Sequence, residues 1–98
     1  MTEQSEVKAP EVRQHVIYCD SRGMDHDAIV TIVWPNMGGA GKPGVNLVYV
    51  SNDEARQDSY GRQIERATSV SHRSVMNVHG NYWRYTDEER NPYTPPQT

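Results

Sequence analysis

A lysine that follows closely spaced glycines is a familiar phosphate-binding pattern, because glycine lets backbone amides approach the phosphate oxygens. The chain carries one such stretch, Gly38-Gly39-Ala40-Gly41-Lys42. Pro43 stands where a serine or threonine would bind magnesium, and the valine-rich segment 45–50 follows where a helix would have to begin. The pattern therefore predicts a flexible loop over residues 35–44 and not a nucleoside triphosphate site.

Groups that could bind a metal ion occur together at Asp25-His26-Asp27, and further histidines are His15, His72 and His79. Zinc and manganese accept carboxylate and imidazole ligands. The histidines form neither a His-x-His pair nor an i, i+4 pair, so their spacing does not favour a shared site. We predict surface or turn residues here, with Asp25 and Asp27 solvating the turn before a strand, and no metal or other cofactor.

Nucleophilic catalysis needs a base and an orienting group close to the nucleophile. No serine lies in a nucleophile-elbow sequence, and Ser71, His72 and Ser74 look like ordinary polar residues. Cys19 ends an apolar segment, which favours a buried and inert thiol. We assign no catalytic residue and predict that the protein is not an enzyme.

The stretch from residue 56 to residue 73 is rich in arginine and contains one tyrosine. Guanidinium groups bind phosphates and tyrosine stacks on bases, so the stretch is a candidate site for a nucleotide or for single-stranded nucleic acid. Four acidic residues between positions 53 and 65 interrupt it, which is more typical of a solvated surface. The candidate ligand-binding residues are Tyr60, Arg62, Arg66 and Arg73, with Arg56 beside them.

The apolar composition favours strands over helices. Eleven valines and four isoleucines stand against one leucine and no phenylalanine, and β-branched side chains suit a pleated surface. Alternating or short apolar segments bounded by turn residues predict five strands. They are residues 14–19, 28–34, 45–50, 63–72 and 81–85.

Two finer expectations concern the strands and the segment between the third and fourth of them. Both faces of strand 28–34 are apolar, so we expect both to be covered. We also expect Trp34 at its end, and Trp83 in the last strand, to belong to the core. Residues 52–62 are polar and follow Ser51, which has capping-box spacing to Glu54, so we expect at most one or two helical turns there.

Five short strands around one limited core predict an all-β fold, namely a small five-stranded SH3-like barrel or sandwich. The barrel domain is predicted over residues 13–86. An acidic, polar arm over residues 1–12 precedes it, and a Pro-rich tail over residues 87–98 follows it. Both extensions are predicted to lack a core of their own.

Charge, hydropathy and cysteine content argue against several classes of partner and cellular location. The net charge of −3 argues against bulk binding of nucleic acid. No apolar run approaches the length of about 20 residues that spans a bilayer, and the polar first ten residues do not resemble a signal peptide. With a single cysteine no internal disulfide can form, which suits a reducing cytoplasm.

The core pattern resembles that of a group of small, mostly uncharacterised proteins of tailed bacteriophages. The resemblance is carried by AIVTIVW at 28–34, VNLV at 45–48, TSV at 68–70 and YWRY at 82–85, and it covers roughly residues 15–85. It brings no catalytic residues. It implies a phage gene product, either a virion accessory protein or an early factor that acts on the host.

Together these observations predict a non-enzymatic virion accessory protein that decorates or stabilises the capsid or assists assembly, found in the virion or the host cytoplasm. Its partners would be viral structural proteins or further copies of itself. The predicted interface residues are Pro35, Asn36, Met37, Lys42, Tyr93 and Pro95. The alternative is a small oligomeric binding protein that captures a nucleotide signal or blocks a host defence protein.

Overall fold

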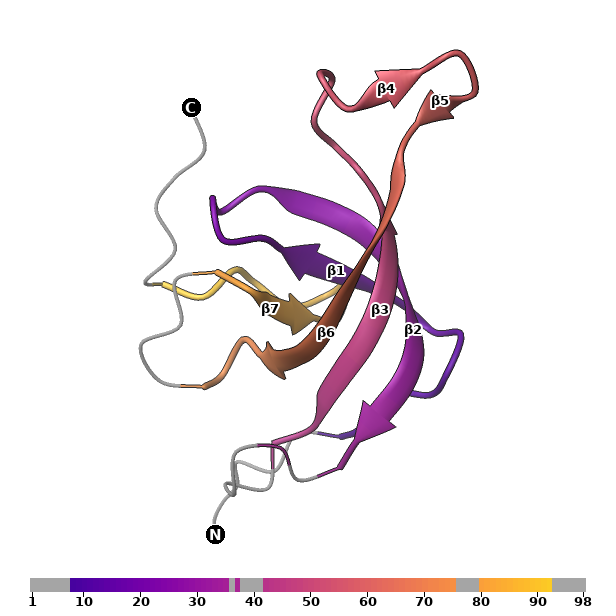
Figure 1. The fold of residues 1–98 in the computed structure, drawn as a ribbon. Coiled ribbons are helices and arrows are strands. Elements are labelled where there is room, and N and C mark those ends of the chain that lie inside the picture. The colour runs from indigo at the N-terminus through magenta and orange to yellow at the C-terminus, as the bar shows by residue number, and fades with distance from the viewer. Residues whose placement is uncertain (1–7, 36, 38–41, 76–79, 93–98) are drawn as a thin grey trace, which may run out of the picture.

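The computed structural model describes residues 8–35, 37, 42–75 and 80–92. The described residues form strands and no helix, so none of their segments is a helix that could cross a membrane. The strands are β1 (His15–Cys19), β2 (Asp25–Trp34), β3 (Gly44–Val50), β4 (Gln57–Asp58), β5 (Gly61–Arg62), β6 (Ile64–His72) and β7 (Tyr82–Arg84) (Figure 1).

Five of these strands close into a barrel in the order β1-β2-β3-β6-β7. Strand direction cannot alternate all the way round a ring of five, so one neighbouring pair must be parallel. That pair is β6 and β7, and β7 pairs antiparallel with β1 on its other side. The predicted all-β fold with a small SH3-like barrel is confirmed.

The barrel interior is filled mainly by valine and aromatic side chains. Trp83 is the largest of them, and its indole Nε1–H donates a hydrogen bond to the carbonyl oxygen of Pro43 at 3.1 Å. The prediction that Trp83 belongs to the core is confirmed. The core cluster consists of Val16, Tyr18, Ala28, Val30, Val45, Leu47, Val70 and Trp83.

Two bulges bend the sheet on either side of β3, and Asn46 lies between them. The β2–β3 register shifts between Val30 and Ile32, and the β3–β6 register shifts opposite Asn46, where Ser69 adopts a positive φ of 54°. Asn46 Oδ1 accepts hydrogen bonds from Trp34 Nε1–H at 3.1 Å and from the Ser69 backbone N–H at 2.9 Å. One side-chain oxygen thus satisfies donors from both bulged strands.

The bulge in β2 overturns two predictions about strand 28–34. One extra residue moves every later side chain to the opposite face. Val33 therefore packs against the core, whereas Ile32 and Trp34 are 39% and 42% exposed. The prediction that both faces are covered is wrong, and so is the prediction that Trp34 is a core residue.

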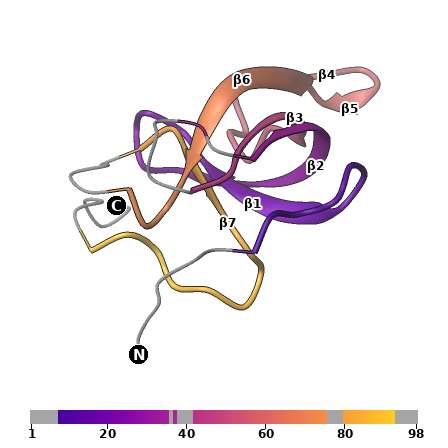
Figure 2. The ribbon, with the colours of Figure 1, turned by 90° about the horizontal axis from the view of Figure 1, so that it is seen from below.

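Residues 52–62 form an arm that contains the two short strands β4 and β5, which the prediction of at most one or two helical turns there did not include. The arm continues the β3–β6 pair, with Gln57 opposite Arg62 and Asp58 opposite Gly61. Asp58 Oδ1 accepts the backbone N–H of Tyr60 at 2.8 Å, and Gly61 has the positive φ of 114° that glycine tolerates. Figure 1 and Figure 2 both show β4 and β5 projecting away from the five barrel strands.

We predict that Asn46→Leu lowers the free energy of unfolding by about 1 kcal/mol, because two donors lose their acceptor and water replaces it only in part at these exposed bonds. Urea denaturation followed by tryptophan fluorescence measures the loss. Gln57→Leu is the matched control, since it also removes a side-chain amide whose oxygen accepts an exposed bond, but that bond comes from Arg62 Nε and does not bridge two bulged strands. A loss at Asn46 no greater than that at Gln57 would contradict the bridging role.

Candidate functional site

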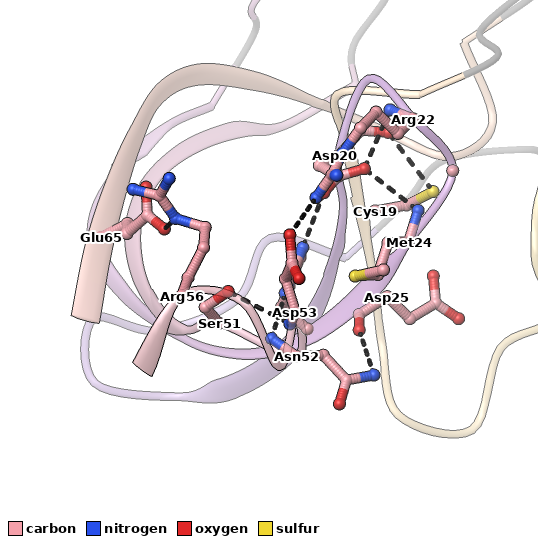
Figure 3. Close-up of polar contacts among 12 residues, drawn as sticks. Cys19, Asp20, Arg22, Met24, Asp25, Ser51, Asn52, Asp53, Arg56 and Glu65 are labelled. Carbon is pink, nitrogen blue, oxygen red and sulfur yellow. Dashed lines mark hydrogen bonds and ion pairs between the residues drawn. The ribbon is translucent and has the colours of Figure 1, made fainter. Parts of the chain in front are cut away.

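One end of the barrel is open and is lined by polar and aromatic side chains, which we call the barrel mouth. The Tyr18 and Tyr49 ring centroids lie 4.8 Å apart, and the His26 ring lies 4.6 Å from Tyr49. The hollow has a volume of about 290 Å³. Figure 3 shows most of the polar groups at its rim. The lining residues are Tyr18, Asp20, Ser21, Arg22, His26, Tyr49, Ser51, Arg56 and Glu65.

His26 connects the turn after β1 with the base of the arm. Its ring is almost fully buried, and Nδ1 accepts the backbone N–H of Asn52 at 2.9 Å. The ring proton therefore resides on Nε2, which donates to Asp20 Oδ2 at 2.8 Å. The imidazole thus links two chain segments that are not paired with each other as strands.

The Asp20 carboxylate accepts three hydrogen bonds in the turn after β1. Burial raises its pKa, but the hydrogen bonds from His26 and from the backbone N–H groups of Met24 and Arg22 outweigh that effect, so the pKa lies below its usual value. The Arg22 guanidinium in turn lies 3.3 Å from Asp53 Oδ2. Figure 3 shows Asp20, Arg22 and Asp53 pointing toward one another.

A second ion pair, between Arg56 Nε and Glu65 Oε2, lies on the other side of the mouth. Charged groups at the rim thus pair with one another around the two tyrosine rings. Such a mouth can bind a planar ligand by stacking and by guanidinium contacts. Sequence reasoning did not find this group, because it depends on which side chains of β1, β2, β3 and β6 point inward.

A different surface is formed by the outward side chains of β1, β2, β3 and β6, and we call it the outer face. Its two cross-strand rows follow from the register. Ile29, Val50 and Ile64 on it are 41%, 48% and 72% exposed. One row is His15, Ile29, Val48 and Arg66, and the other is Ile17, Asp27, Val50 and Ile64.

His72, Ser74 and Glu88 form an arrangement that superficially resembles a catalytic triad. His72 Nδ1 lies 2.8 Å from Ser74 Oγ, and Nε2 lies 2.9 Å from Glu88 Oε1. The two amides nearest the hydroxyl are already engaged, because Ser74 N–H donates to Nδ1 and Val75 N–H donates to the carbonyl of His72. Neither can stabilise an oxyanion, so we interpret the group as a cap on the turn after β6.

The predicted ligand-binding residues do not converge on one pocket. Tyr60 is 98% exposed at the tip of the arm, and Arg62 in β5 donates to Gln57 Oε1 and to the carbonyl of Ser51. Arg66 lies on the outer face. Arg73 follows the far end of β6, a strand of nine residues and thus about 30 Å long, where it donates to the carbonyl of Arg90 at 3.5 Å.

Some of the predicted interface residues line a shallow hollow of about 400 Å³. Pro35 and Met37 lie there beside Trp34 and Ser69. Lys42 is partly buried next to the start of β3. The other three, Asn36, Tyr93 and Pro95, lie outside the described residues.

Asp25 and Asp27 were predicted to solvate a turn, but both lie within β2. Strand pairing begins at Asp25, whose carboxylate lies 3.1 Å from the Arg84 guanidinium, while Asp27 pairs with His15 at 2.8 Å. Cys19 is fully buried as predicted, and burial raises the pKa of its thiol.

Comparison with known proteins gives no match to this chain among family models, curated proteins or solved structures.

We predict that the free energy of unfolding decreases as the pH is lowered, over a pH range set by His72. Burial lowers the pKa of its ring, although the contact with Glu88 opposes this, whereas in the unfolded chain the ring binds a proton near pH 6.5. Below that pH the unfolded state binds more protons, so the free energy of unfolding decreases until the pH passes the lower folded pKa.

Urea denaturation at several pH values between about 5 and 7.5 measures this slope around the ordinary histidine pKa. His72→Gln should flatten it. His15→Gln is the control, because the His15 side chain is half exposed. An unchanged slope in His72→Gln would show that this ring does not set the pH dependence.

Proposed function

We propose that the protein is a non-enzymatic accessory protein of a phage virion that acts through protein–protein contacts, either decorating or stabilising the head or assisting its assembly. The observation that carries this proposal is the projecting arm with Tyr60 at its tip, 98% exposed. The five strands close into a ring, although β6 pairs with β7 only at Ser71 and His72, and the side chains on its faces and on the arm are available for contacts.

The backbone of the arm is held by its own contacts. These are the ladder bonds, the Asp58 bond to the Tyr60 N–H and the Arg62 bond to Gln57, and they present the exposed Tyr60 ring at the tip. A tyrosine has few side-chain torsions to fix on binding, and tyrosine is among the residues that contribute most to protein interfaces. Tyr60 therefore has the properties of an anchor residue.

Trp34 offers a second aromatic group. Its Nε1–H is held by Asn46 Oδ1, and its ring is partly exposed beside Pro35 and Met37. Indole rings with one satisfied polar atom and one accessible face are enriched in interfaces. This hollow supports the proposal that the loop after β2 contacts a neighbouring subunit. The phage context itself rests on the resemblance of the core pattern.

We expect the chain in purified virions of the phage that encodes it, by mass spectrometry. We also expect Tyr60→Ala to weaken rebinding to virions stripped of the protein by about tenfold or more, the effect typical of an anchor residue. Ser59→Ala, in the same turn, is the control. Absence of the chain from virions would refute the proposal.

The barrel mouth supports an alternative function, the capture of a nucleotide signal. Tyr49 is partly exposed there, and the Arg22 and Arg56 guanidiniums flank it. None of the candidate residues Tyr60, Arg62, Arg66 and Arg73 lines the mouth.

We expect a ligand of this site to raise the midpoint of thermal unfolding. A ligand concentration of about 100 times Kd adds about 2.7 kcal/mol to the free energy of unfolding. A panel of cyclic and linear nucleotides tests this, with Arg56→Gln as the variant that should reduce the shift. Arg66→Gln, outside the mouth, is the control. No shift at millimolar nucleotide would exclude this alternative.

A further inference from the structure

The outer face holds a contiguous aliphatic centre. Ile29 is paired opposite Val48, and Val50 is paired opposite Ile64, so the four side chains occupy adjacent positions on β2, β3 and β6. Three of them are at least two-fifths exposed. Contiguous apolar surface of this kind on a small domain marks an interaction site more often than a random surface does.

Charges of opposite sign flank this centre. On the β2 side lies Asp27, whose side chain is 76% exposed and whose ion-pair partner is His15. On the other side, Arg66 follows Ile64 in β6 and Arg62 precedes it in β5. Among the described residues, neither Arg62 nor Arg66 takes part in an ion pair.

We propose that the outer face binds a second copy of this chain in a symmetric dimer. A two-fold axis that runs in the interface along β3 places β2 of one copy against β6 of the other. Val48 and Val50 then meet their own counterparts, and Asp27 lies over Ile64 of the other copy, between Arg62 and Arg66. The same patch serves both copies, as an isologous interface requires.

Charge complementarity distinguishes a second copy from other occupants. An acidic partner of a different kind would leave Asp27 facing like charge, and a nucleic acid would meet aliphatic side chains where it needs stacking platforms. In the dimer Asp27 of each copy lies close to Arg62 and Arg66 of the other copy. The patch has four aliphatic and three charged members, which is few compared with the roughly 20–30 residues a side of a standard interface, so the dimer should dissociate at micromolar concentrations.

This inference rests on the proposed contact function and names one partner for it. It also leaves the arms outside the interface centre, so that a dimer presents two Tyr60 side chains to a lattice. The dimer and the virion contact are separable, because Tyr60 is not part of the apolar centre or of the charged pairs.

Sedimentation velocity over a wide concentration range tests the dimer. The wild-type chain should shift from monomer to dimer as concentration rises. Asp27→Arg and Arg66→Asp should each weaken the dimer by about tenfold or more, because each places like charges in contact. The double variant with both substitutions restores an opposite pair in each copy and should recover most of the affinity.

Asp87→Arg is the matched control, since it makes the same charge change at an exposed position off the outer face. Circular dichroism and the unfolding midpoint establish that each variant is folded. A wild-type chain that stays monomeric throughout, or a double variant no better than the single ones, would overturn the proposal. If the monomeric chain still copurifies with virions, only the dimer is refuted and the contact function stands.

Discussion

Closing five short strands into a ring forces the sheet to bend sharply beside β3, and the other features of the molecule follow from that bend. The extra residues in β2 and β6 lie opposite Asn46, whose Oδ1 accepts one donor from each bulged strand. Each of these bonds links a bulged strand to β3, and a hydrogen bond contributes on the order of 1 kcal/mol net. The bend is therefore tied to one amide side chain.

The bend decides which side chains reach the surface. It turns Trp34 and Ile32 outward after the bulge, while Val33 packs inward. Tyr18, His26 and Tyr49 instead meet at the open end through the regular pairing before the bulge, where Tyr18 lies opposite His26 and Tyr49 lies opposite Ala28. The exposed apolar positions thus follow from the same register that fills the core.

Much of the barrel could be predicted from the sequence, because β-branched segments bounded by glycine and proline are strong local signals. Trp83 is in the core as predicted. The bulge at Thr31 could not be predicted, because a threonine in a valine-rich strand looks like any other strand residue. The arm was missed for a related reason, since its local signals are limited to Asp58 and Gly61.

The candidate sites were less predictable than the fold. His26 contacts Asp20 six residues earlier and the Asn52 amide 26 residues later, and only the folded register brings the three together. His72 likewise finds Glu88 across 16 residues. Residue types suggested arginine-rich contacts, but strand geometry distributes those arginines between the arm, the outer face and the far end of β6.

The single thiol offers a way to observe the barrel opening. Cys19 is fully inaccessible at the end of β1, next to β7, and it is the one cysteine in the sequence. An alkylating reagent can reach it only when that end of the barrel separates, so its modification rate reports the frequency of local opening without any introduced label.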